Sequence, residues 1–174
     1  TDMPVRVSST RGLGAYANVV AIESFMDELA AASGVDPVEY RLRFMKDPRA
    51  REAIVKAAEK FGWSQWRKRP GFGRGIGFAK YKNIAGYCAI AMEVHVNPDN
   101  GRIRVIRAVA SADVGHIVSP DGVSNQIEGG LVQGLSWTLK EEVQMDDTQI
   151  LSQDWNSYPI LKFSEVPPVE MVLI

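Results

Sequence analysis

The sequence has few of the side chains that most often bind metals or form covalent cross-links. It contains one cysteine, Cys88, and two histidines, His95 and His116. A single cysteine cannot form an intrachain disulfide or a CxxC motif, and neither histidine has a carboxylate at the spacing of a helical metal site. We therefore expect no metal centre built from these side chains. Cys88 lies in an apolar run, which favours a buried core thiol.

Neither sign of charge predominates, and long apolar runs are absent. The 20 Lys and Arg residues nearly balance the 21 Asp and Glu residues, which gives a formal net charge of -1. A nucleic-acid-binding protein needs a basic patch that displaces phosphate counterions, so nucleic acid is not an expected partner. No apolar run approaches the roughly 20 residues that span a bilayer, and we expect no membrane span.

Two common catalytic motifs, the P-loop and the nucleophile elbow, are also missing. The glycine-rich stretch 71–77 lacks the GxGxxG spacing of a dinucleotide site, and it opens a predicted strand rather than a helix. Its glycines favour close backbone contact within a sheet over phosphate binding.

The first third of the sequence predicts helices joined by short loops. A loop over residues 1–15 precedes a helix at about 16–33, whose apolar residues recur at three- and four-residue steps. Asp-Pro pairs at 36–37 and 47–48 each place a capping aspartate before a proline at the first helical position. These signals predict a second helix and a third that ends at Gly62.

After the third helix the pattern changes to that of β-strands. Strands are predicted at 73–81, 87–96 and 102–112, where apolar and polar residues alternate in part. The intervening Asn100-Gly101 pair is a strong turn signal, so the second and third strands should form an antiparallel hairpin. A long helix capped by Ser119 or Asp121 is predicted to follow, to about residue 140.

Together these elements predict an α+β fold. An N-terminal helical part is followed by an antiparallel sheet with one long helix packed on it. We divide the chain into a loop and helical segment at 1–63, a basic linker at 64–72, and a sheet-plus-long-helix segment of the same domain at 73–174. Residues 169–174, apolar except for Glu170, predict a further strand, and we expect the domain to continue beyond Ile174.

Two places in the sequence suit a polar ligand on physical grounds. Arg11 lies between small residues just before a helix start, where backbone N–H groups favour an anion; a solvated arginine in a surface turn is the alternative. Asn125 and Gln126 lie early in the long helix, where amides can bond to a polar heterocycle; a helix-cap network is the alternative.

An ordered set of motifs then suggests a family. The motifs are Arg11-Gly12-Leu13-Gly14, segments 21–30 and 34–42, Asp113-Val114-Gly115, Val118-Ser119-Pro120, and segments 126–135, 158–160 and 167–170. In this order they resemble the molybdopterin-binding subunit of the xanthine oxidase and aldehyde oxidase family. Segment 73–96 is most similar to the bacterial isoquinoline 1-oxidoreductase-like branch.

The resemblance implies a molybdenum hydroxylase that oxidises an aldehyde or an N-heterocycle. The family uses molybdenum on a pterin dithiolene, here expected in the cytosine dinucleotide form, and a glutamate base acts on a hydroxide that derives from water. Electrons leave through a small partner subunit that carries 2Fe-2S clusters. The cofactor performs the chemistry, and the protein binds and orients it.

The resemblance also assigns roles to individual residues. Gln126 matches a glutamine that contacts the pterin cofactor, and Arg11 matches an arginine near the molybdenum centre. Leu13 matches a substrate-pocket position that is aromatic in some relatives. Glu128 is helical and does not match the catalytic base, which the family places in a Gly-Glu-Pro motif expected beyond Ile174. We therefore expect no catalytic residue in this chain, and by itself neither bound cofactor nor activity.

Two other interpretations are compatible with the sequence. The chain could be a non-catalytic binding or assembly module with the same fold, or an α+β domain of another kind. The substrate and the compartment, bacterial cytoplasm or periplasm, are left open.

Overall fold

A computed structural model describes residues 10–82 and 84–174 of the chain. The first nine residues of the loop expected at 1–15 lie outside the described residues. The chain divides into two compact units, Thr1–Met45 and Lys46–Ile174. The division expected at 64–72 remains a prediction about domain organisation.

The first unit contains two helices, α1 (Ala15–Ala32) and α2 (Pro37–Phe44). Asp36 caps α2 as predicted, because its carboxylate accepts a hydrogen bond from the backbone N–H of Val38 at 2.9 Å, and Pro37 takes the first helical position. Ala30 is the buried residue of α1. Because this apolar core is small, polar contacts contribute strongly to the packing of α2 against α1.

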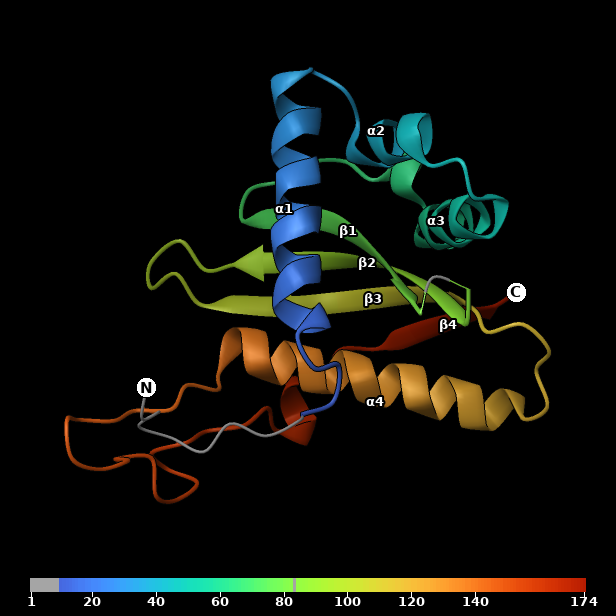
Figure 1. The fold of residues 1–174 in the computed structure, drawn as a ribbon. Coiled ribbons are helices and arrows are strands. Elements are labelled where there is room, and N and C mark those ends of the chain that lie inside the picture. The colour runs from blue at the N-terminus through green and yellow to red at the C-terminus, as the bar shows by residue number, and fades with distance from the viewer. Residues whose placement is uncertain (1–9, 83) are drawn as a thin grey trace. The chain divides into compact units, whose positions relative to one another are not determined.

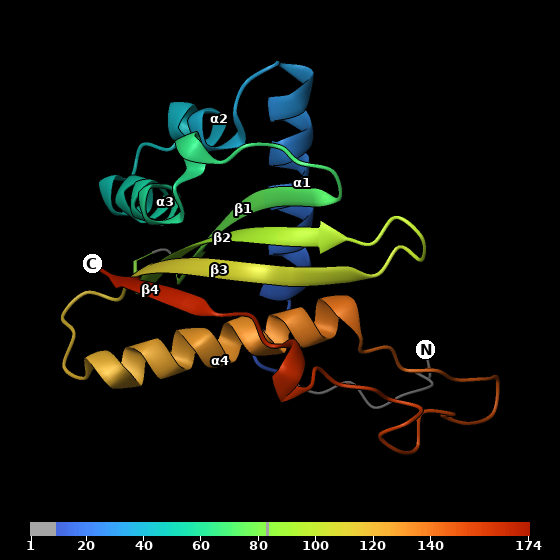
Figure 2. The same cartoon turned by 180° about the vertical axis from the view of Figure 1, so that it is seen from behind.

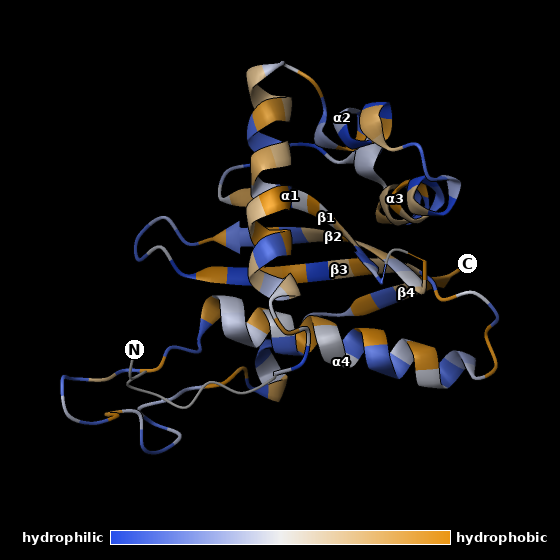
Figure 3. Ribbon diagram, in the orientation of Figure 1, coloured by the Kyte–Doolittle hydropathy of each residue, from blue (hydrophilic) through white to orange (hydrophobic). Residues whose placement is uncertain are grey.

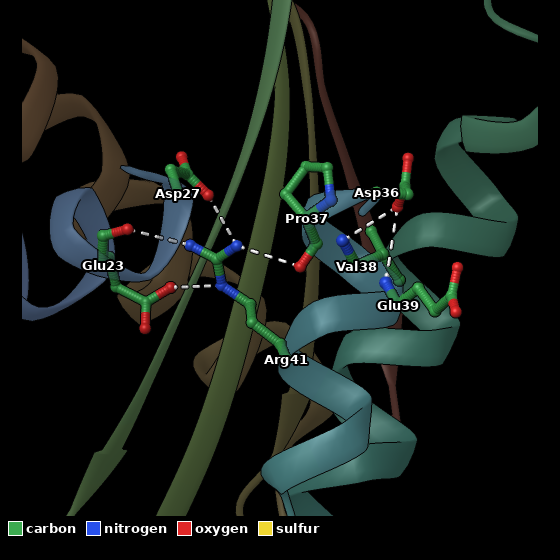
Figure 4. A network of polar contacts seen from close by, with 7 residues as sticks. All are labelled: Glu23, Asp27, Asp36, Pro37, Val38, Glu39 and Arg41. Carbon is green, nitrogen blue, oxygen red and sulfur yellow. Dashed lines mark hydrogen bonds and ion pairs between the residues drawn. The ribbon is translucent and has the colours of Figure 1, made fainter. Parts of the chain in front are cut away.

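Arg41 on α2 makes most of these polar contacts (Figure 4). Its side chain is 2% exposed and forms ion pairs with Glu23 at 2.8 Å and Asp27 at 2.6 Å, both on α1. Its remaining N–H groups donate to the backbone carbonyls of Pro37 and Glu23, at 3.1 Å each. A buried arginine whose three nitrogens all donate hydrogen bonds is geometrically well defined. It therefore fixes α2 against α1.

The second unit is a four-stranded sheet with helices (Figures 1 and 2). Its elements, in chain order, are α3 (Pro48–Phe61), the 3-10 turn η1 (Trp63–Gln65), β1 (Phe72–Tyr81), β2 (Gly86–Val96), β3 (Ile103–Asp113), α4 (Pro120–Leu139), the 3-10 turn η2 (Phe163–Glu165) and β4 (Val169–Leu173). Gly62 ends α3 with a φ of 72°, a left-handed conformation that glycine adopts at little cost. The α+β class and the long helix predicted from the sequence are confirmed.

The strand order is β1-β2-β3-β4. The predicted hairpin is present, since β2 and β3 are antiparallel and Gly101 occupies the turn with a φ of 69°. β1 is also antiparallel to β2. β4 runs parallel to β3, so the sheet is mixed rather than wholly antiparallel as expected. The reason is that the chain crosses over through α4 before it returns to the sheet.

Alternate residues of the strands face two different helices. Ala89, Ala91 and Val109 are fully buried on the face that packs against α3. On the other face, Leu131 and Leu135 of α4 form a core cluster with Val105 and Ala108, flanked by Ile90, Met92 and Val94. Hydrophilic residues interrupt the hydrophobic ones along β3 (Figure 3). The second half of β3, 108–113, is buried throughout, as expected of a strand that is covered on both faces.

One buried carboxylate interrupts the apolar surface beneath α3. Glu93 on β2 lies opposite Arg107 of β3 and accepts hydrogen bonds from Arg69 at 2.5 Å and the Trp66 ring N–H at 3.1 Å. Arg107 Nε lies 3.5 Å from the same carboxylate, and its guanidinium stacks over the Phe61 ring. The cluster ties η1 and the following loop to the sheet.

The segment between α4 and β4 is mostly irregular, with an isolated bridge from Met145 to Ile150. It returns along α4, where the backbone N–H of Leu161 donates to Ser136 Oγ at 2.9 Å. The Tyr158 hydroxyl donates to Glu141 at 2.7 Å. These bonds place residues 158–161 beside the C-terminal end of α4.

Candidate functional site

The loop that leads into α4 is anchored at its start by Asp113. The carboxylate of Asp113 accepts two hydrogen bonds from Arg49, from Nε and Nη2 at 2.6 Å each, in the bidentate geometry typical of arginine and carboxylate. It also accepts from the backbone N–H of Gly115 at 2.9 Å. Gly115 has a φ of 75°, which favours glycine at the bend. The pKa of Asp113 is lowered, chiefly by the hydrogen bonds from Arg49.

Arg49 is itself held by the neighbouring residues. Its guanidinium lies 4.4 Å from the centre of the Tyr87 ring, and Nη1 donates to the carbonyl of Ile84 at 2.9 Å. The Tyr87 hydroxyl bonds to Asp47, the residue that caps α3, and this bond raises the pKa of Tyr87. Asp47, Tyr87, Arg49 and Asp113 thus form one connected polar network between α3 and the sheet.

The helix α4 begins where the sequence predicts. Ser119 is its N-cap and accepts from the backbone N–H of Gly122 at 3.3 Å. Of the two capping candidates, the structure selects Ser119, while Asp121 lies in the first turn. A carboxylate there interacts favourably with the positive end of the helix dipole. The capped helix gives the following residues a fixed direction.

The predicted polar residues of α4 lie on its surface. Asn125 and Gln126 are exposed, and Glu128 is partly buried. Asn125, Glu128 and Gly129 line a shallow groove of about 470 Å³ that is closed on one side by Ile160 and Leu161. Gln126 follows Asn125 on the helix and is not among the lining residues of this groove. The groove offers amide donors and acceptors beside a backbone stretch without a side chain.

Arg11 and Leu13 lie together in the turn that precedes α1. The backbone N–H of Leu13 donates to Thr10 at 3.1 Å, and that of Ala15 donates to Gly12 at 3.0 Å. Leu13 has a φ of 51°, uncommon for a residue with a side chain, and is 66% exposed. The helix has no side-chain cap and no acidic residue in its first turn. Gln126 belongs to the other unit.

The network around Asp113 was not foreseen from the sequence. The motif Asp113-Val114-Gly115 stands out by resemblance alone, and its observed role is to shape a bend. The hairpin register could have indicated that Tyr87 and Asp113 are neighbours, because the two residues are paired at the ends of β2 and β3. Arg49 gave no comparable signal, since it is 64 residues away along the chain.

Replacing Asp113 by alanine should destabilise the second unit by about 1–3 kcal/mol, because Arg49 and the Gly115 N–H lose a charged acceptor. Asp113→Asn keeps an acceptor oxygen and should cost less. Urea unfolding followed by circular dichroism measures both. Asp147→Ala, at an exposed aspartate, is the control and should be nearly neutral. A stability of Asp113→Ala equal to that of the control would contradict this role.

Two further observations concern possible metal ligands and the single cysteine. Residues 10–82 and 84–174 contain no group of three His, Cys, Asp or Glu side chains placed to hold a metal ion. Cys88 is half-buried in β2, and burial raises its pKa to about 11, so the thiol stays protonated at neutral pH. None of the described helices is long and apolar enough to cross a membrane.

Comparison with known proteins gives a family match and several similar curated sequences. A family model described as "Molybdopterin cofactor-binding domain" matches residues 8–167. One of the subunits of nicotinate dehydrogenase from Pseudomonas putida is 38% identical over 185 residues, which cover 98% of this chain and 16% of that protein. The beta subunit of isoquinoline 1-oxidoreductase from Brevundimonas diminuta is 33% identical over 171 residues, 98% of this chain and 22% of that protein. The chain therefore spans less than a quarter of the length of these relatives.

Comparison with solved structures supports the fold. An aldehyde oxidoreductase from Desulfovibrio gigas superposes with a TM-score of 0.77 over 96% of this chain and 36% of that chain, at 13% sequence identity. At this identity the likeness concerns the arrangement of elements alone.

Proposed function

Because the chain belongs to the molybdopterin cofactor-binding domain family, we propose that it forms part of the cofactor-binding subunit of a molybdenum hydroxylase. The observation that carries the proposal is the match of the family model to residues 8–167. The names of the two relatives, a nicotinate dehydrogenase and an isoquinoline oxidoreductase, favour an N-heterocycle as substrate, with an aldehyde as the other candidate.

The surface of α4 fits a pterin cofactor chemically. A pterin presents a polar heterocyclic edge that needs both hydrogen-bond donors and acceptors, and primary amides supply both. Asn125 and Gln126 are exposed amides on one helical turn, and Gly129 permits close approach to the helix backbone. We propose that Gln126 holds the pterin edge. The described residues would bind the organic part of the cofactor rather than coordinate the metal.

When bound, the cofactor supplies a two-electron oxidation in which the substrate C–H becomes C–OH, with water as the oxygen source and two protons and two electrons released. The relatives are named as subunits, which supports a partner that accepts the electrons. We propose that this partner carries 2Fe-2S clusters and that the cofactor is the cytosine dinucleotide form.

The turn before α1 is proposed to contribute in a different way. Arg11 is exposed ahead of a helix start that has no capping side chain or acidic residue, an arrangement that favours an anionic group. Leu13 is exposed and held with a positive φ, and strained residues of this kind cluster at functional sites. We propose that Arg11 contacts the cofactor and that Leu13 contributes an apolar surface to the substrate pocket.

Glu128 is proposed to act as a structural residue rather than as the catalytic base. It is partly buried on α4 and lines the groove beside Asn125. We therefore place the chemistry of proton abstraction outside the residues of this chain.

Gln126→Ala tests the proposal in the complete natural protein with its partner subunit. Loss of the amide leaves the polar edge of the cofactor without a partner, which typically costs about 1–3 kcal/mol, so the molybdenum content should fall several-fold. Gln65→Ala, at an exposed glutamine in η1, is the matched control. Elemental analysis measures the metal, and thermal unfolding should show both variants close to the wild type. Full molybdenum content and full turnover in Gln126→Ala would refute the assignment.

A further inference from the structure

A second hollow lies at the other end of α4, away from Gln126. It has a volume of about 860 Å³ and lies between the end of the β2–β3 hairpin, the last turn of α4 and the segment around η2. Gln126 and Lys140 are 14 residues apart on or next to α4, which corresponds to about 21 Å along the helix axis. The hollow therefore lies away from Gln126, although Leu161 lines both the hollow and the groove beside Asn125.

The walls of this hollow are strongly cationic. Four of its lining residues carry a positive charge and one carries a negative charge; they are Arg102, Arg104, Lys140, Lys162 and Glu165. Four positive charges less one leave an excess of three, in a chain whose formal net charge is -1. The negative end of the α4 dipole, about half a charge, offsets only a small part of this excess.

The carboxylate of Glu165 binds two of these cations, Lys140 and Arg102, through one of its oxygens. Its Oε1 accepts from Lys140 Nζ at 2.5 Å and from Arg102 Nη2 at 3.2 Å. Its Oε2 accepts from the backbone N–H of Lys162 at 2.9 Å. One carboxylate balances only one of the two cations, and both cations have more N–H donors than these bonds use. Glu165 therefore positions the charged groups of Lys140 and Arg102, with their N–H donors, in the absence of a ligand.

Part of the wall of the hollow is apolar. Val105 is 6% exposed in the core cluster, and Leu139 and Leu161 pack against that cluster. Both residues and Val105 also line the hollow. Apolar residues beside convergent charged groups, in a volume within the range of about 300–1,000 Å³, suit a small molecule with an apolar and a charged part.

We propose that this hollow binds a small organic anion, whose phosphoryl or carboxylate group lies among Arg102, Arg104 and Lys140 and whose apolar part lies against Val105, Leu139 and Leu161. The site does not include Gln126, and its test does not depend on the cofactor. Phosphoryl and carboxylate groups share the planar or tetrahedral array of oxygens that guanidinium groups bind bidentately.

The proposal is tested by calorimetric titration of the complete natural protein with phenyl phosphate, benzoate and phenol. The two anions should bind, more weakly as salt is raised, while the neutral phenol should bind at least tenfold more weakly. Whichever anion binds more tightly identifies the phosphoryl or the carboxylate class. Absence of binding by both anions at millimolar concentration, or equal binding of phenol, would overturn the proposal.

The variant Arg104→Gln isolates the role of charge in the hollow. Arg104 is exposed on β3, so its loss should leave the melting temperature unchanged while weakening the tighter anion about tenfold, as expected for one charge-assisted contact. Lys46→Gln removes the same charge at an exposed residue just before α3 and should leave the affinity unchanged. Equal affinity in the wild type and Arg104→Gln would also overturn the proposal.

Discussion

Arg41→Ala should lower the stability of the first unit by about 3–5 kcal/mol, the cost typical of breaking a buried ion pair by removing one partner. The loss is large because Arg41 is 2% exposed and its partner Glu23 only 16% exposed, so Glu23 would keep a poorly solvated charge. Asp27, at 48% exposed, can return to water at less cost. Two backbone carbonyls would also lose their donor.

Native-state hydrogen exchange read by mass spectrometry is the suitable measurement, because it reports on residues 15–44 separately from the sheet. Arg41→Lys keeps the charge but not the planar fork, and it should fall between the alanine variant and the wild type. Arg43→Ala is the control, since Arg43 forms an exposed pair with Glu39 four residues away, usually worth less than about 1 kcal/mol. Equal protection of α1 and α2 in both alanine variants would contradict the role given to Arg41.

Glu93→Ala should destabilise the second unit by about 2–3 kcal/mol, the usual range for loss of a charged hydrogen-bond partner. The side chain of Glu93 is buried, and its removal leaves Arg69, Arg107 and the Trp66 N–H without their shared acceptor. We expect a smaller loss than for Arg41 because Arg69 is more than half exposed and can be hydrated again. Glu93→Gln retains an acceptor for Trp66 and should cost less than alanine.

The dependence of stability on pH gives an independent check on Glu93. Desolvation raises the pKa of Glu93, but hydrogen bonds from Trp66 and Arg69 outweigh it and the net shift is downward. A carboxyl with a lowered folded-state pKa stabilises the protein above its unfolded pKa of about 4.3, and this contribution is lost as the pH falls through the folded value. The stability gap between wild type and Glu93→Gln should therefore be full at pH 7 and shrink below about pH 4.

Urea unfolding at several pH values measures this gap. Glu52→Gln, at an exposed position of α3, provides a control in which no such gap is expected. A gap that stayed constant from neutral to strongly acidic pH would show that the charge of Glu93 does not contribute.

The elements that could be predicted from the sequence are those with local signals. Asp-Pro pairs mark the starts of α2 and α3 because a capping carboxylate and a proline act within one turn of the helix. Asn100-Gly101 marks the hairpin because the turn needs a left-handed residue. The parallel direction of β4 had no such signal, since it depends on where the chain returns after α4.

The polar contacts that shape the molecule were harder to foresee. Arginine is usually exposed, so nothing in the sequence singled out Arg41 as a buried residue, and its partners lie 14 and 18 residues away. The candidate residues Arg11, Leu13 and Gln126 came from resemblance to a family. Their roles remain proposals, because the chain spans less than a quarter of the length of these relatives.

The parallel pairing of β3 with β4 also sets an order of assembly. The hairpin of β2 and β3 closes a turn of a few residues, whereas β4 can dock only after the chain has closed the span 114–168. Loop closure over such a span costs about 2 kcal/mol more than closure of a short turn. The three antiparallel strands can therefore form early, and the fourth joins late. During that interval the free edge of β3 offers unpaired N–H and C=O groups to any extended segment nearby, a route to misfolding that the arrival of β4 closes.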